Sequence, residues 1–429
     1  MVATGARAFT PRRWWTGPFD VEQLAWSAVT RARDAAAELA AARGLALTVD
    51  TTADLVAASF SAIEHLRIDG RVPQAWGELS GFVEARDGWV RLHGNYPHHA
   101  EVLRRVFGVH DRSSLQREVA RRDAAEIEDE VTAAGGIAAR VRTCQEWAAH
   151  PQDRAQQDAE WVNITQRGQR PALPPAASSS TNSAPNLLAG VRVLDLTRVI
   201  AGPSGTQLLA CLGADVLRID PPHRPELADQ HLSAGMGKRS ALLDLRRDPD
   251  QFQTLAAGAD VIVCGYRPGA LDALGLGIEV LEQLAPRAVI VSLSAWGETG
   301  PWGHRAGFDS IVQAATGIAT ECGADGRPGA LPVQALDHAT GQLLAAHVLE
   351  SLARARASTQ RLSLLGAARA LLAMPSPPVE APETLEVPRA RVTAAGKVLD
   401  AVPPPLRVEG VSIERPVGEY GAAELCWQL

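Results

Sequence analysis

A single aspartate, Asp337, stands where an apolar loop gives way to a long apolar helix. The stretch reads "ALDHATG", and the helix that we predict continues through "QLLAAHVLESLARA". Aspartate at this place is typical of a helix N-cap, which accepts backbone N–H groups of the first turn and contributes roughly 1 kcal/mol. The same N–H groups and the helix dipole would hold a carboxylate ionised and fixed in direction, as a nucleophile requires. The residues alone leave both roles open for Asp337.

Three further segments carry groups suited to an anionic ligand. The turn "RVIAGPSG" follows an apolar strand and opens a helix, where free backbone N–H groups can meet an anion. With only two glycines it departs from GxGxxG, so a dinucleotide site is weakly supported. Lys238 and Arg239 precede a strand and could hold a phosphate, while Tyr266 and Arg267 lie at a strand end. Each segment is also compatible with an ordinary turn or solvated surface, which is the more common role of a pair of cations in a loop.

Two other kinds of reaction centre find little support. The histidines of the first half lie on a predicted hairpin and loop, at spacings that match no zinc geometry well, so we expect no metal. No G-x-S-x-G occurs, so a serine hydrolase elbow is not indicated. The histidines in question are His93, His98, His99 and His110.

A loop at residues 294–310, with four glycines and two tryptophans, could approach and cover a ligand.

The elements that would position these groups alternate between strand and helix. Apolar runs at "VRVLDLT", "DVLRID", "RSALLDL", "DVIVCGY" and "RAVIVSLSAWG" are separated by helical patterns. Such alternation predicts an α/β fold with a Rossmann-like parallel sheet covered on both faces. Ligands of these sheets bind at the carboxyl ends of the strands, where the turns named above lie.

Composition divides the chain into four parts. Residues 1–169 read as a smaller α+β region, with a hairpin predicted around Asp87-Gly88 in "GFVEARDGWVRLHG". Residues 170–187 contain the Pro/Ser-rich linker "RPALPPAASSSTNSAPN". Residues 188–373 hold the alternating strands and helices. Residues 374–429 form a Pro-rich tail, which we expect to be loosely ordered with a few short strands, as in "RVEGVSIERP".

The totals narrow the class of protein. The chain has 429 residues, enough for two or three domains, and its net charge of -7 provides no general basic field, so nucleic acid is not an expected partner. The five cysteines are scattered without a CxxC, and no run of about 18 apolar residues predicts a membrane span. We therefore expect a soluble cytoplasmic protein that binds small molecules or copies of itself.

Taken together, the segments resemble the class III coenzyme A transferases, the CaiB/BaiF family, which includes formyl-CoA transferases and 2-methylacyl-CoA racemases. The likeness covers residues 188 to about 373. It rests on "GVRVLDLTRVIAGPSGTQLLACLGADVLRIDPP", "GKRSALLDL", "DVIVCGYRPGALDALGLG", "LSAWGETGP", "GFDSIVQAATGI" and "ALDHATGQLLAAHVLESL". Residues before the linker resemble the small domain of the family, which ordinary members carry after the nucleotide-binding part. The resemblance thus implies a permuted unit or a remnant of a tandem ancestor.

The resemblance implies that Asp337 is the catalytic nucleophile of a CoA-transferase acting on an acyl-CoA and a carboxylic acid. CoA would be a substrate, no cofactor would be bound permanently, and the protein would form an interlocked homodimer. The chain departs from the family at Cys264, where an asparagine is common before the aromatic residue. It also lacks the run of consecutive glycines that closes over the site in formyl-CoA transferases. The implied CoA contacts are Arg198, Val199, Ile200, Ala201, Lys238, Arg239, Gly265, Tyr266 and Arg267.

Two alternatives stay open within the resemblance. A racemase or epimerase needs a second base, which the family supplies as a histidine directly before an aspartate; here Phe308 stands there, which favours the transferase. His338 and His304 are the remaining candidates for that base. The missing glycine run and the reversed order of parts are also compatible with a non-catalytic CoA-binding subunit or a decayed copy.

Overall fold

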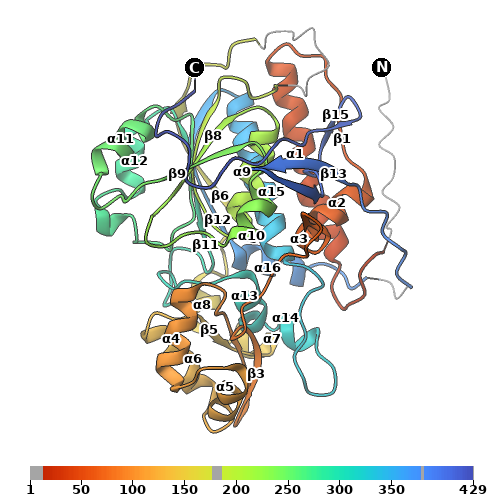
Figure 1. Ribbon diagram of the computed structural model, residues 1–429, viewed down its shortest axis with the longest axis vertical. Coiled ribbons are helices and arrows are strands. Elements are labelled where there is room, and N and C mark those ends of the chain that lie inside the picture. Colours follow the sequence, from red (N-terminus) through yellow and green to blue (C-terminus); the bar gives the residue numbers. More distant parts are fainter. Residues whose placement is uncertain (1–12, 176–185, 378–380, 429) are drawn as a thin grey trace.

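A seven-stranded mixed sheet forms the centre of the computed structural model, which describes residues 13–175, 186–377 and 381–428 (Figure 1). The strand order is β6-β12-β11-β10-β7-β8-β9, and all neighbours run parallel except β6, which is antiparallel to β12. The predicted α/β fold is confirmed. The strands are β6 (Val162–Gln169), β7 (Arg192–Leu196), β8 (Asp215–Asp220), β9 (Lys238–Leu242), β10 (Val261–Cys264), β11 (Val289–Ser294) and β12 (Arg356–Ser363).

Helices cover both faces of this sheet because its central strands are mostly apolar on both faces. Successive side chains of a strand point to opposite faces, so Val193 of β7 joins one core and Leu194 the other. The first core is closed by α1 (Val21–Ala42), α9 (Ala201–Cys211), α15 (Ala335–Ala353) and α16 (Leu364–Leu372). The second is closed by α11 (Pro249–Ala257) and α12 (Ile278–Leu284), on the opposite side in Figure 1.

Helix α15 is largely buried in the first core, packed between α9 and α1. Its contact with α9 is made by glycines on both sides. A Cβ on Gly205 of α9 would lie 2.5 Å from the carbonyl oxygen of Gly341 in α15, and a Cβ on Gly341 would overlap Ser204 Oγ and the carbonyl oxygen of Ala201. The two backbones can approach this closely only because neither position carries a side chain.

The residues before the linker form a small separate unit and also part of the central sheet and its core. A three-stranded antiparallel sheet has its own apolar core. The predicted hairpin is present, with its turn at Arg86-Asp87, one residue before the predicted Asp87-Gly88. By contrast, α1 and β6 pack into the central sheet and its core. The separate body consists of β3 (Gly81–Ala85), β4 (Gly88–Leu92), β5 (Ala138–Arg140), α4 (Pro97–Phe107), α5 (Arg112–Val119) and α6 (Ala124–Ala133). Most of the predicted linker, residues 176–185, lies outside the described residues.

Shorter elements connect the bodies. Helices α2 (Ala53–Phe60) and α3 (Ala62–His65) follow α1, while α7 (Cys144–Ala148) and α8 (Pro151–Ala155) lead into β6. Helix α10 (Ala228–Ala234) follows β8, and α13 (Asp309–Thr316) and α14 (Ile318–Glu321) precede α15. No helix in the described part of the chain is both long and apolar enough to cross a membrane.

The C-terminal segment differs from the loosely ordered tail that we expected. It forms β13 (Ala390–Ala394), β14 (Lys397–Ala401), β15 (Arg407–Val408) and β16 (Val411–Ser412), the last two within "RVEGVSIERP". Strand β14 pairs with β2 (Arg67–Ile68), and β15 pairs with β1 (Val49–Asp50). Buried apolar side chains such as Leu399, Leu406 and Ile413 fix the segment to the first core, which outweighs the effect of its prolines.

We predict that Gly341→Ala destabilises the protein. The added methyl group would overlap backbone and side-chain atoms of α9, so the two helices must move apart and lose packing, at a cost of about 1–3 kcal/mol. Urea denaturation measures the change. Ala353→Ser, which adds one atom at the half-buried end of the same helix, is the control and should change stability little. Equal stability of Gly341→Ala and wild type would contradict the close contact.

Candidate active site

Asp337 lies in the first turn of α15 but is not the residue that caps it. The helix begins at Ala335, its N-cap is Gln334, and no side chain of the N-cap residue accepts a hydrogen bond. The N-cap role predicted for Asp337 is therefore wrong. The side chain is 6% exposed, among the buried charged residues of the protein. Its backbone N–H donates to Oδ2 of Asp309 over 3.0 Å.

Asp309 takes over the capping of α15 from a distant place in the sequence. It is the first residue of α13 and is fully buried. Its carboxylate accepts the backbone N–H groups of Leu336 and Asp337 and a side-chain N–H of Gln313. The amide oxygen of Gln313 in turn accepts the N–H of Leu331, in the loop before α15. The two carboxyl groups, Asp309 and Asp337, therefore face one buried site.

Burial controls the protonation of both groups. Burial raises the pKa of Asp309 to about 6, although its hydrogen bonds and the charge of Arg91 act in the opposite direction. Burial and then the negative charge of Asp309 raise the pKa of Asp337 well above its ordinary value. Our expectation that the first turn of the helix keeps Asp337 ionised is thus wrong. The N–H groups of that turn stabilise Asp309 instead, and Asp337 holds its proton more tightly than a solvated aspartate.

The small sheet borders this pair of carboxyl groups through β4. Arg91 is almost fully buried, and its guanidinium lies 4.8 Å from the ring centroids of Trp76 and Phe82. Just beyond β4, the imidazole of His93 stacks on Phe308 with ring centroids 3.9 Å apart and an angle of 10°. Burial lowers the pKa of His93 to about 3, so this ring is neutral. A histidine therefore lies beside Phe308, the position at which the resemblance implies a histidine in racemases.

The turn between β7 and α9 is strained. Val199 has φ of +67°, a conformation that a β-branched residue rarely adopts. Its N–H donates to Glu226 Oε2 over 3.1 Å, and its carbonyl oxygen accepts from Gln230 Nε2 over 2.7 Å. The N-cap residue of α9 is Ile200, which has no capping side chain. Backbone strain that is held by specific partners is common at binding sites. Here these partners fix the backbone directly before the first residue of α9.

Glu226 connects this turn to the small sheet. Besides the Val199 N–H, its carboxylate accepts hydrogen bonds from Arg218 Nη2 over 2.7 Å and from the hydroxyl of Tyr96. Burial opposes ionisation, but Arg218 and Arg198 lower the pKa of Glu226 below its usual value. The guanidinium of Arg198 lies 4.6 Å from the ring centroid of Tyr96. Arg198 is therefore held between the small sheet and the central sheet, and its side chain is only partly accessible.

The end of β10 lies beside this turn, as the strand order requires. The N–H of Gly265 donates to the carbonyl oxygen of Leu196 at the end of β7 over 3.3 Å. Tyr266 is half-buried, and Arg267 is exposed. The structure thus brings together two of the three predicted groups of ligand contacts, at residues 198–201 and 265–267.

Lys238 and Arg239, the third predicted group of ligand contacts, are already paired with other groups of the chain. Lys238 is buried, and its Nζ donates to Asp195 Oδ2 over 3.1 Å and to the carbonyl oxygen of Pro203 over 2.8 Å. Arg239 forms two hydrogen bonds with Asp215, of 2.8 and 2.9 Å, and a third to the carbonyl oxygen of Cys426. Both cations are paired within the chain, Lys238 with Asp195 of β7 and Pro203 of α9, and Arg239 with Asp215 of β8.

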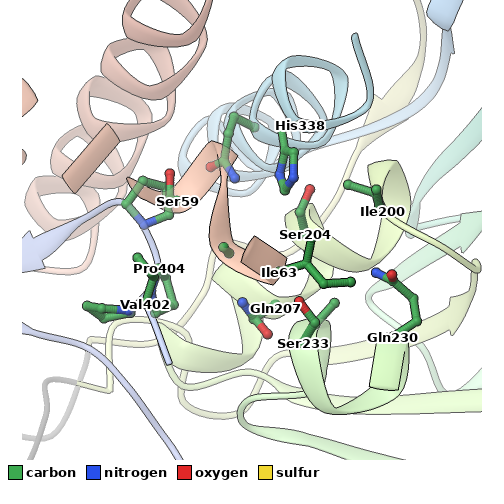
Figure 2. A pocket seen from close by; sticks show the side chains of 15 residues that line it. Ser59, Ile63, Ile200, Ser204, Gln207, Gln230, Ser233, His338, Val402 and Pro404 are labelled. Atoms are coloured by element: carbon green, nitrogen blue, oxygen red, sulfur yellow. The ribbon is translucent and has the colours of Figure 1, made fainter. Parts of the chain in front are cut away.

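A cavity opens on the other side of the first turn of α15. Figure 2 shows Ile200 and Ser204 from α9, His338 from α15 and Gln230 from α10 around it. With the part open to solvent it encloses about 530 Å³. Burial lowers the pKa of His338 to about 4, so the ring is neutral, and it packs on Phe60 with centroids 5.2 Å apart. The residue after Asp337 therefore faces a cavity, while Asp337 faces Asp309.

Comparison with known proteins connects the second half of the chain to one group of proteins. The family model described as CoA-transferase family III matches residues 188–378. The probable fatty acyl-CoA transferase of Mycobacterium tuberculosis is 37% identical over 181 residues, which cover 38% of this chain and 46% of that protein. The succinyl-CoA:glutarate CoA-transferase of Mus musculus is 38% identical over 169 residues, which cover 36% of this chain and 39% of that protein.

The chain spans less than half the length of these relatives. A crystal structure of a hypothetical protein from Mycobacterium tuberculosis has a TM-score of 0.41 and 35% sequence identity, covering 43% of this chain and 56% of that chain. The family match includes Asp309, Asp337 and the turns at 198–201 and 265–267. Arg91 and His93 lie outside it.

The raised pKa of Asp337 predicts a stability that depends on pH. A carboxyl group that binds its proton more tightly in the folded chain contributes stability at low pH, which is lost as the pH rises through the folded pKa. Asp337→Asn removes the titrating carboxyl group, and with it the loss of stability at high pH. We expect the variant to gain free energy of unfolding over wild type at pH 8, on the order of 1 kcal/mol, and clearly less at pH 5, as measured by urea denaturation.

The control for this prediction is Asp325→Asn, which makes the same chemical change at an exposed position. Its stability relative to wild type should be the same at both pH values. A pH-independent difference for Asp337→Asn would mean that the carboxyl group titrates as it does in the unfolded chain.

Proposed function

We propose that the protein transfers CoA from an acyl-CoA to a carboxylic acid, with Asp337 as the nucleophile, because residues 188–378 match the family model described as CoA-transferase family III. The observation that carries this proposal is the buried carboxyl group of Asp337, whose backbone is fixed by Asp309 at the start of α15. A carboxylate that attacks a thioester must be held in one direction and shielded from water, which would hydrolyse the activated intermediates.

The proposed reaction proceeds through covalent intermediates. A carboxylate oxygen of Asp337 attacks the thioester carbonyl carbon, and the C–S bond breaks to give a mixed anhydride and the CoA thiolate. The thiolate attacks the aspartyl carbonyl and releases the donor acid as its carboxylate, leaving an aspartyl-CoA thioester. The acceptor carboxylate repeats these steps in reverse, forms the new acyl-CoA and restores the carboxylate of Asp337.

Burial has opposite effects on this reaction. A poorly solvated carboxylate is a stronger nucleophile once ionised, but the high pKa of Asp337 leaves a smaller fraction ionised at neutral pH. The negative charge of Asp309 raises the pKa of Asp337 further and so lowers the ionised fraction. Asp309 also fixes the backbone of Asp337. Its own negative charge is partly offset by Arg91 of the small sheet. The small sheet would therefore tune the nucleophile without contacting it.

The proposed CoA site uses the adjoining ends of β7 and β10. The strained turn at 198–201 begins a helix without a capping side chain, and Arg267 offers an exposed cation one strand away. Lys238 and Arg239 are left out because the chain itself pairs them. Within one chain, β4 and β5 of the small sheet pack on α13, whose Asp309 binds the first turn of α15. The interlocked homodimer implied by the resemblance is a separate part of the proposal.

We predict that Asp337→Ala abolishes transfer. Without the carboxylate no aspartyl-CoA forms, so the rate with any acyl-CoA and acid should fall by about 10³-fold or more. Intact-mass spectrometry of wild type incubated with acyl-CoA should show a covalent CoA adduct that the variant lacks. Asp325→Asn is the control and should form the adduct. Full activity in Asp337→Ala would refute the nucleophile, and CoA binding without any adduct in wild type would favour a non-catalytic subunit.

The transfer rate should also depend on pH through Asp337. Because the nucleophile must be ionised, the rate should rise as the pH passes upward through its raised pKa. Asp309→Asn removes the neighbouring negative charge, so this rise should move to lower pH, while burial still keeps it above the range of a solvated aspartate. The rate measured from pH 4 to pH 9 checks the shift, again with Asp325→Asn as control. An unmoved profile would show that the two groups are not coupled.

A racemase remains the second candidate, because neutral histidines lie on both sides of the first turn of α15. His93 stacks on Phe308 beside Asp309, and His338 lines the cavity. Either histidine and Asp337 would have to exchange protons with the carbon next to the thioester. Incorporation of solvent deuterium at that carbon without an acceptor acid would support this reaction. Transfer without deuterium incorporation would exclude it.

A further inference from the structure

Arg91 lies on the face of the small sheet that packs on α13. Side chains alternate along a strand, so Val90 and Leu92 point into the sheet's own core and Arg91 points to the opposite face. Its neighbours across the strands are Phe82 of β3 and Ala139 of β5, which both pack with the first core. Arg91 is 8% exposed. A guanidinium is thus buried between apolar neighbours.

No acidic side chain neutralises Arg91 within the part of the chain that the structure describes. It forms no ion pair there, and its guanidinium donates no hydrogen bond. The acidic group that acts on it is Asp309, whose carboxylate is already engaged by the first turn of α15 and by Gln313. Burial and then the like charge of Arg112 lower the pKa of Arg91 to about 10, so it is still protonated at neutral pH. A buried cation without a counter-charge destabilises a protein, and a bound anion would remove this effect.

Arg112 adds a second cation that has no carboxylate partner among the described residues. Its Nη1 donates to the carbonyl oxygen of Ser80 over 3.0 Å, and its Nη2 to that of Phe82 over 2.7 Å. Glu78 accepts its backbone N–H over 3.4 Å but forms no ion pair with its guanidinium. Phe82 lies directly across the sheet from Arg91. Two fixed cations therefore make this part of the small sheet attractive to an anion.

The guanidinium of Arg91 keeps one edge free for a ligand. The rings of Trp76 and Phe82 lie over it, each with its centroid 4.8 Å from Cζ. Nε is enclosed without a partner, whereas Nη1 and Nη2 donate to no described residue but remain accessible. Aromatic rings attract the face of a guanidinium and leave the N–H groups in its plane unsatisfied. The two Nη atoms therefore form an unused fork, the arrangement from which carboxylates accept hydrogen bonds in pairs.

Trp76 opens this fork to solvent on an apolar surface. The tryptophan is 41% exposed. The loop before it is fixed by Asp229 of α10, which accepts two hydrogen bonds from Arg71 and the backbone N–H of Gln74. A ligand at the Nη atoms of Arg91 therefore meets one pair of donors beside an indole ring. Such a setting suits an organic carboxylate better than a phosphate, whose higher charge requires more donors.

We propose that Arg91 binds the carboxylate of a small organic acid through Nη1 and Nη2, and that Trp76 packs on the apolar part of the same acid. This binding does not depend on the CoA transfer proposed above. Arg91 and Trp76 both lie outside residues 188–378, which the family model matches. The bound acid would lie on the small sheet, near the stack of His93 on Phe308, because the ring centroids of Trp76 and His93 are 6.4 Å apart.

Butyrate and its neutral analogue butyramide test the role of Arg91. Isothermal titration of the full chain should detect butyrate, while butyramide and inorganic phosphate should bind at least roughly tenfold more weakly. Arg91→Met removes the cation but keeps an unbranched side chain, so butyrate should bind roughly tenfold more weakly or less tightly still. Arg117→Met, the same change at an exposed position of α5, is the control and should bind butyrate as wild type does. No binding to wild type, phosphate binding as tight as that of butyrate, or unchanged butyrate binding in Arg91→Met would each overturn the proposal.

Arg91→Lys separates binding from a structural role. Lysine keeps the charge but replaces the fork with one ammonium, so butyrate affinity should fall between those of wild type and Arg91→Met. The melting temperature of Arg91→Met without ligand should not fall, because no described residue loses a hydrogen-bond partner. If Arg91→Met folds poorly, Arg91→Lys decides, since butyrate affinity equal to that of wild type would refute binding through the fork.

Trp76→Ala tests the apolar part of the site. Relative to acetate, hexanoate should lose roughly fivefold in affinity for this variant, whereas Arg91→Met should weaken both acids alike. Val72→Ala, in the same loop and 60% exposed, is the control and should leave the ratio of the two affinities unchanged. A wild-type ratio in Trp76→Ala would show that the chain of the acid does not lie on the indole and would overturn this part of the proposal.

Discussion

The hydrogen bonds from the first turn of α15 to the carboxylate of Asp309 are the contact on which the site depends. They join α13 to α15, fix the backbone of Asp337 and place a second acid beside it. Because Asp309 is fully buried, its charge is tolerated only with these donors and with Gln313. The same contact couples the geometry of Asp337 to its pKa, so changing one changes the other.

Around this contact, the small sheet and the central sheet meet through charged and aromatic groups. Arg91 influences Asp309, His93 stacks on Phe308, and Tyr96 donates to Glu226. Glu226 in turn holds the strained backbone of Val199 at the start of α9. A chain of contacts thus runs from the small sheet to both regions that we propose for CoA and for chemistry. The small sheet therefore acts as a support for the site and not as an appended body.

The sequence could predict elements whose signals are local. The strands were recognised because their apolar runs are continuous, and the hairpin at residues 81–92 because Asp-Gly follows alternating residues. The α15 helix was placed correctly, but its cap was not, because the capping carboxylate comes from 28 residues earlier. Lys238 looked available for phosphate because its partner, Asp195, is brought to it only by the order of strands. The left-handed Val199 and the fixed C-terminal strands likewise depend on tertiary contacts that no local pattern contains.

The pairing of the C-terminal strands with β1 and β2 bears on how the chain acquires its structure. The N–H of Val398 bonds to Asp69, so two residues 329 positions apart must meet before this part of the fold is complete. During synthesis the earlier strands emerge long before their partners and wait with unpaired edges. Contacts of such long range slow folding, because much chain must be ordered first. The strands at residues 397–408 are therefore translated well after residues 49–68, whose strands they pair with.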